Sequence, residues 1–212
     1  ESGAATGTNK YGLLLALIDL APAVNRASRV LGLTEITEKL IEIHWNHADE
    51  VPWHGGQRVL RQLKSGNFEN TTLVTQIAAL KAEIWQLRHE QARTRVDAQR
   101  WNAMCKAIQA ETLRNPLIKL QYLGKHQTPF LYEIDKGKRS IRFVAGALED
   151  LVQYGKILRP LIESRFIAFV MRYNGDPNND VDLYAHFFGA DRYMPGLSLR
   201  RGLWELQNGL CL

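Results

Sequence analysis

The chain has 212 residues, of which 45% are hydrophobic, so it can bury a core and is not an intrinsically disordered chain. The longest apolar run, residues 11–23, contains Asp19 and is too short to cross a bilayer, so no membrane partner is predicted. Residues 1–9 are small and polar and lack the basic and apolar regions of a secretory signal. We predict that they form a linker or a disordered end.

The positive charge is concentrated in two segments. The formal net charge is +5, a modest excess that many nucleic-acid binders share. Residues 54–64 carry three arginine or lysine residues and no acid, and residues 114–142 carry seven against two acids. Because the charge of these two segments exceeds that of the whole chain, the remainder is slightly acidic. This distribution favours a focused cationic surface that binds a polyanion.

Helical spacing of apolar residues dominates the first half of the chain, up to about residue 113, where Thr71 and Asp97 are predicted N-caps. From residue 117 to residue 144 short runs alternate apolar and polar residues, which predicts two or three strands with a hairpin between the last two. Helical spacing then returns. The predicted helices are residues 10–23, 34–47, 57–63, 71–87, 97–113, 145–154, 160–173, 181–188 and 197–207; the predicted strands are 117–123, 130–134 and 140–144.

These elements predict an α+β fold that is mostly helical, with a small β-hairpin or a three-stranded sheet. Residues 10–144 are predicted to form a winged-helix-like DNA-binding domain, in which a basic hairpin lies beside a basic helix. Residues 145–195 are a helical extension, and residues 196–212 contain a final helix.

The predicted basic helix over residues 57–63 is the first candidate for DNA recognition. Its arginine and glutamine side chains, Arg58, Arg61 and Gln62, are types that form paired hydrogen bonds with base edges in the major groove. Lys64 would contact phosphate, and Trp53, beside a glycine pair, would stack on a base. The alternatives are an ordinary solvated helix face and a tryptophan that fills the core.

The basic hairpin is the second candidate. Lys136, Lys138 and Arg139 lie in or beside its turn, where such side chains contact the phosphate backbone and position a protein without reading sequence. The alternative is nearly as strong, because a charged edge also protects a small sheet from aggregation. Together with the basic helix, this turn is predicted to form one continuous face that grips a duplex.

Residue types that bind transition metals are sparse and poorly spaced. His44 and His47 lie three residues apart on a predicted helix, close enough to share a metal ion. The cysteines, Cys105 and Cys211, lie far from them, so no recognisable zinc spacing results. We therefore favour a buried or capping His44, a surface His47 and no cofactor in this chain. Two isolated cysteines also fit a reducing cytoplasm.

Several stretches in a fixed order resemble the N-terminal region of a bacterial family of HNH endonucleases. They are KYGLLLALIDL (10–20), ITEKLIEIHW (36–45), VLRQ (59–62), PLIKLQ (116–121), RFIAFVMRYN (165–174), DLYAHFFG (182–189) and LQNGLC (206–211). The resemblance covers most of the chain from Lys10 onward. It implies a DNA-reading domain joined to a C-terminal ββα-metal nuclease, in a class of restriction enzymes many of which cut only modified DNA.

The resemblance assigns a role to one residue of this chain. Residues 196–212 would be the lead-in helix to an HNH domain beyond Leu212, with Cys211 as the first ligand of a zinc knuckle. Zinc and a divalent catalytic metal are implied for that further domain. No catalytic residue is carried over.

The leading hypothesis is a DNA-binding specificity domain of an HNH restriction endonuclease, which acts on double-stranded DNA in phage defence. Modified DNA is one candidate target, and a homodimer is compatible with this role. The alternative is a helical protein–protein interaction or dimerisation module without DNA binding, whose aromatic-rich helices pack against a partner.

Overall fold

The computed structural model describes residues 7–53, 56–62, 70–84, 87–175 and 181–189. In these residues the fold is α+β and mostly helical, as predicted, with small antiparallel sheets of two or three strands. No helix in the described part of the chain is long and apolar enough for a membrane span.

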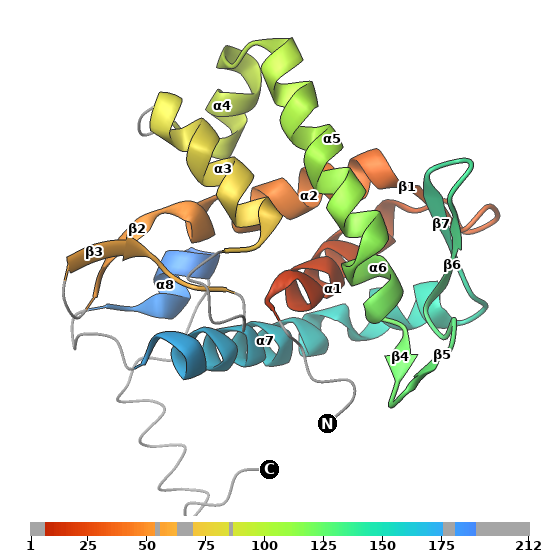
Figure 1. Cartoon of the computed structure of the whole chain (residues 1–212). Helices are drawn as coiled ribbons and strands as arrows, with labels where there is room; N and C mark the ends of the chain where they lie inside the picture. Colours follow the sequence, from red (N-terminus) through yellow and green to blue (C-terminus); the bar gives the residue numbers. More distant parts are fainter. Residues whose placement is uncertain (1–6, 54–55, 63–69, 85–86, 176–180, 190–212) are drawn as a thin grey trace, which may run out of the picture.

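Helix α1 (Asn9–Leu20) forms the centre of the core, between α2 (Leu33–His44) and α7 (Ala147–Asn174) (Figure 1). It is apolar on nearly every side, and Leu13, Leu15 and Leu17 are fully buried, as expected for a helix that other elements enclose. Helix α2 begins where the carboxylate of Glu35 accepts a hydrogen bond from the Gly32 N–H at 2.8 Å. Short 3-10 turns follow both helices, η1 (Ala21–Ala23) and η2 (Asn46–Ala48).

A three-stranded antiparallel sheet lies at one end of the molecule, on the right in Figure 1. Its strands β1 (Val30–Gly32), β6 (Tyr132–Asp135) and β7 (Ser140–Phe143) have the order β1-β7-β6. Ile141 in the central strand pairs with Leu31 on one side and Ile134 on the other. The predicted basic hairpin is therefore confirmed.

The helix predicted over residues 57–63 is wrong. Strand β3 (Gly56–Val59) occupies the first part of this segment and pairs with β2 (Glu50–Trp53) in a second hairpin. Gly56 pairs with Trp53 and has a φ of 132°, a conformation that glycine adopts in hairpin turns. Gly56 therefore begins the second strand of a hairpin, and the described residues 57–62 contain no helix.

Two further predictions are wrong at proline residues: a helix begins at Pro116 where a strand is predicted, and one helix continues through Pro160 where two are predicted. Residues 117–123 were expected to be a strand, but α6 (Pro116–Lys119) begins there, because a first-turn proline loses no helical hydrogen bond. The short strands β4 (Tyr122–Leu123) and β5 (His126–Gln127) follow. The two helices predicted between residues 145 and 173 are the single helix α7, which contains Pro160. Proline has no N–H, so the backbone carbonyl four residues earlier loses its helical hydrogen bond. Because Pro160 is exposed, water can bond that carbonyl instead.

The remaining helices are α3 (Thr72–Glu83), α4 (His89–Arg95), α5 (Ala98–Arg114) and α8 (Leu183–Phe188). The N-caps predicted at Thr71 and Asp97 are confirmed, since their side chains accept hydrogen bonds from the backbone of Val74 and Arg100. Helices α3 to α5 lie in the upper part of Figure 1, and their buried apolar residues belong to the main core cluster described next.

Apolar side chains form two clusters. The main cluster contains α1, α2 and the three-stranded sheet, together with Leu148 and Leu151 of α7. The second packs Trp53 and Leu60 against Phe166 of α7 and against α8. Helix α7 therefore belongs to both clusters, and the main cluster contains residues from both sides of residue 144.

Candidate nucleic-acid interface

The β2–β3 hairpin, with Arg58, and the β6–β7 hairpin lie at opposite ends of the molecule (Figure 1), so the described cations of the two basic segments do not form the single face expected from the sequence. The β2–β3 hairpin is bonded to Asn174, the last residue of α7, whereas the β6–β7 hairpin leads into Ala147, its first residue. A helix of 28 residues is about 42 Å long at 1.5 Å per residue. Helix α7 therefore separates the two hairpins by most of the molecule.

The segment around Arg58 is fastened to the end of α7. The indole N–H of Trp53 donates to the Asn174 carbonyl at 2.8 Å, and the Arg58 guanidinium donates to the same oxygen at 3.4 Å. The side-chain amide of Asn174 bonds both the N–H and the carbonyl of Arg61 at 2.8 Å. Trp53 is only 3% exposed, which is incompatible with the predicted stacking on a base.

Gln62 is also part of the core. Its amide oxygen accepts a hydrogen bond from the Thr8 hydroxyl at 2.8 Å, and its amide nitrogen donates to the His47 carbonyl at 3.1 Å. Because the residue is fully buried, the base contact predicted for it is wrong. Lys64, Cys211 and the helix predicted over residues 197–207 lie outside the described residues.

The turn of the β6–β7 hairpin presents all three predicted cations, Lys136, Lys138 and Arg139, to solvent. The carboxylate of Asp135 accepts a hydrogen bond from the Lys138 N–H at 3.0 Å, which fixes the turn. The ammonium of Lys138 is 3.9 Å from the same carboxylate, a solvent-exposed ion pair that contributes little free energy. Both lysines can therefore turn toward an external anion.

Arg139 has a structural role that the sequence did not suggest. Its guanidinium donates to the amide oxygen of Gln109 on α5, and its carbonyl accepts from the Leu33 N–H at 2.9 Å. The amide nitrogen of Gln109 in turn donates to the Thr34 hydroxyl at 3.3 Å. Arg139 therefore ties the basic turn to α5 and α2 while remaining exposed, and its predicted phosphate contact stays a prediction.

Helix α5 has a polar stripe beside this turn. Its inner face buries Trp101, Met104 and Ile108, and its outer face contains donors, acceptors and small residues without an acid. The exposed stripe consists of Gln99, Asn102, Ala103, Lys106, Ala110 and Arg114. The helical period that predicts the buried face of α5 also places these acid-free residues together on the opposite face.

Two buried histidines lie where α2 meets α7 and α8. The ring centroids of His44 and His47 are 4.7 Å apart, and both residues are fully buried, so the surface position predicted for His47 is wrong. His44 Nδ1 is 3.0 Å from the Leu40 carbonyl and His47 Nε2 is 2.9 Å from the Phe187 carbonyl. These nitrogens must carry the protons, because a carbonyl only accepts.

Burial has two consequences for these histidines. It lowers the pKa of His44 to about 4 and the pKa of His47 well below its usual value, so both rings are neutral at pH 7. Each also keeps one buried nitrogen without a hydrogen-bond partner among the residues that the structure describes, His44 Nε2 and His47 Nδ1. In the described part of the chain no group of three or more His, Cys, Asp or Glu side chains can hold a metal ion, and two ligands fall short of a zinc site.

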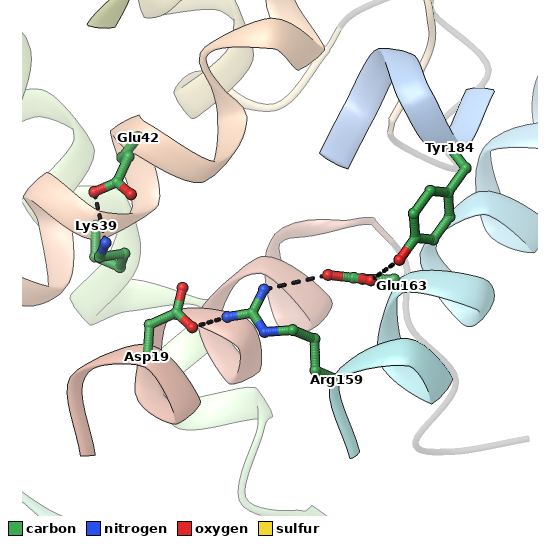
Figure 2. Close-up of polar contacts among 6 residues, drawn as sticks. All are labelled: Asp19, Lys39, Glu42, Arg159, Glu163 and Tyr184. Carbon is green, nitrogen blue, oxygen red and sulfur yellow. Dashed lines mark hydrogen bonds and ion pairs between the residues drawn. The ribbon is translucent and has the colours of Figure 1, made fainter. Parts of the chain in front are cut away.

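Figure 2 shows a line of polar side chains that connects α1, α7 and α8. Arg159 of α7 forms ion pairs with Asp19 of α1 and with Glu163, the latter at 3.2 Å. Glu163 is 1% exposed and accepts a hydrogen bond from the Tyr184 hydroxyl of α8. A carboxylate can be buried only where such partners compensate its charge, so this network is structural.

Replacing Arg159 by methionine is expected to lower the free energy of unfolding by about 2 kcal/mol, because the methionine fills the space but removes charge compensation from Glu163. Urea unfolding followed by tryptophan fluorescence measures the change. Lys156→Met, at an exposed position of the same helix, is the control and should change stability by less than about 0.5 kcal/mol. Equal, small effects of both variants would contradict the structural role.

No protein-family model, curated protein or solved structure matches this chain. A functional proposal must therefore be argued from the geometry and chemistry of the surface itself.

Proposed function

We propose that this chain is a double-stranded DNA-binding module of the winged-helix type. Helix α5 enters the major groove with its exposed stripe, and Lys136 and Lys138 of the β6–β7 turn contact the phosphate backbone. The order of elements supports this: a strand after α1 pairs with the last strand of a hairpin that follows α5. The observation that carries the proposal is the Arg139–Gln109 contact, which holds the basic turn beside α5.

The chemistry of the α5 stripe suits base recognition. Asn102 and Gln99 can bond adenine edges, Lys106 can bond guanine, and alanine leaves room for close approach or contacts a thymine methyl group. With the sequence resemblance described above, these features lead us to infer the specificity part of a restriction-type HNH endonuclease, with modified DNA among its candidate targets.

Binding to duplexes about two helical turns long, plain or with modified bases, tests the proposal by fluorescence anisotropy at 50 and 200 mM salt. Lys136→Ala/Lys138→Ala is expected to weaken binding to every duplex about tenfold and to reduce the log–log salt slope by about 2, because two phosphate contacts are lost. Asn102→Ala/Lys106→Ala is expected to reduce discrimination between duplexes about tenfold.

Arg58→Ala is the matched control, because it removes one exposed cation at the opposite end of α7 and should leave DNA affinity unchanged. If it weakened binding as much as the turn variant, α5 and its turn would not be the interface.

A second candidate function has an observation of its own. Tyr154, Ile157 and Leu161 form a stripe on α7 and are 45%, 64% and 60% exposed, and exposed apolar groups of this kind mark protein–protein contacts. In that case the chain would bind no duplex even at 50 mM salt, and it would self-associate through a contact that Ile157→Glu abolishes.

A further inference from the structure

A polar cavity lies where the first turns of α1 and α3 meet the junction of α5 and α6. Its volume is about 270 Å³, far above the ~10–15 Å³ that one water molecule needs. Its lining is polar and includes Asn9, Lys10, Thr72, Asn115 and Lys119. The cavity is therefore large enough for a phosphate-sized group with part of the molecule to which it is attached.

The charges that line the cavity favour an anion. Lys10 is half-buried, and its pKa is lowered first by burial and then by the positive charge of Lys119. Glu111 also lines the cavity, but its carboxylate bonds the Arg114 guanidinium at 2.8 Å and the Asn115 amide at 3.1 Å. The repulsion between the two lysines is thus left for an external anion to relieve.

Backbone amides at the start of α3 add to this potential. The Thr71 hydroxyl caps the helix by accepting the Val74 N–H at 3.3 Å. The N–H groups of Thr72 and Leu73, in the first turn of this 12-residue helix, have no acceptor within the helix. They add the positive end of the helix dipole to the charge of the two lysines. The side-chain amide of Asn9 also lines the cavity. Its oxygen has no partner among the described residues, and the amide rotated by 180° presents its N–H donors to an anion.

The cavity also has a defined place beside the α5 stripe. Gln109, which holds the basic turn, and Glu111, which lines the cavity, lie about 100° on either side of the exposed Ala110 around the helix. The stripe is therefore bordered by the basic turn on one side and by the cavity on the other. A helix in the major groove has a phosphate backbone on each side of it.

We propose that the cavity at Lys10 and Lys119 binds a phosphate group, supplied by the DNA backbone on the side of α5 opposite the basic turn. The assignment to backbone phosphate rests on the proposed function. The affinity of the cavity for a phosphate group does not rest on the proposed function, because a free phosphate ester has the same negatively charged oxygens as the DNA backbone.

Isothermal titration with inorganic phosphate tests the cavity by itself. The wild-type chain is expected to bind phosphate in the millimolar range, and Lys10→Gln/Lys119→Gln should weaken this at least tenfold. Lys156→Gln removes an exposed cation of α7 outside the cavity and should bind as the wild type does. Lys10→Arg/Lys119→Arg should restore much of the binding. The Gln variant should keep its unfolding midpoint, because Lys10 is half-buried and its positive charge is repelled by that of Lys119.

Duplex binding by the same variants identifies the source of the phosphate. If the cavity holds a backbone phosphate, Lys10→Gln/Lys119→Gln should reduce the salt slope of duplex binding by about 1 to 2. An unchanged slope with lost phosphate binding would support a cavity that takes a free phosphate ester. Wild-type chain that binds no phosphate, or a Gln variant that binds it equally well, would overturn the proposal, whereas the proposed function is judged separately by the turn and α5 variants.

Discussion

Acidification from about pH 7.5 to about pH 5 is expected to lower the free energy of unfolding by at least about 2 kcal/mol. His44 is fully buried, and its pKa is about 4 in the folded chain against about 6.5 when unfolded. Above pH 6.5 the ring is neutral in both states and stability does not depend on it. As the pH falls from 6.5 toward 4, the His44 imidazole is protonated in the unfolded chain but stays neutral in the folded chain. The free energy of unfolding therefore decreases over this range.

His47 changes stability in the same direction, since burial lowers its pKa as well. Burial also lowers the pKa of His89 and of His186, so urea unfolding at several pH values measures the sum of all four effects. His44→Asn removes the titrating group while its amide can still donate to the Leu40 carbonyl. This variant is less stable at neutral pH because of the smaller side chain, but its loss of stability on acidification should be clearly smaller than that of the wild type.

His126→Asn, at an exposed position in β5, is the control and should keep the full pH dependence. Stability that stays constant down to pH 5, or an equal loss in the wild type and in His44→Asn, would show that His44 is not the buried neutral group described above.

Gly12→Ala is expected to destabilise the chain by about 3 kcal/mol. A Cβ at this position of α1 would lie 2.1 Å from Cε1 and 2.8 Å from Nε2 of His44. The imidazole cannot turn away easily, because its Nδ1 is hydrogen-bonded to the Leu40 carbonyl and its ring packs against His47 and Phe166. The result is the opposite of the ~1 kcal/mol gain that alanine normally gives over glycine inside a helix.

Thermal and urea unfolding of Gly12→Ala and Gly137→Ala measure this effect against a matched substitution. A Cβ at Gly137 would lie 3.5 Å from the nearest atom, an oxygen of Asp135, which is an ordinary contact. This control should change stability by less than about 0.5 kcal/mol. A Gly12→Ala chain as stable as the wild type would mean that α1 and α2 pack less closely than the structure has them.

Local patterns predicted the parts of the fold that depend on neighbouring residues. Thr71 and Asp97 were identified as N-caps because a cap needs only its own side chain and the next turn of backbone. The basic hairpin was predicted from two alternating runs with a turn between them. The α+β class followed from the same periodicities. The β2–β3 hairpin was missed because Gly55 and Gly56 fit either a loop or a hairpin turn until the pairing partner is known.

The amino-acid sequence alone determined the class of fold, most helix positions and the basic turn with Lys136 and Lys138. The tertiary structure decided which polar side chains are available to a ligand. Gln62 is bonded to Thr8, Trp53 to Asn174 and Arg139 to Gln109, and each partner is at least 30 residues away. The physical reason is that a buried polar group must find a hydrogen-bond partner, and periodicity along the chain does not reveal a distant one.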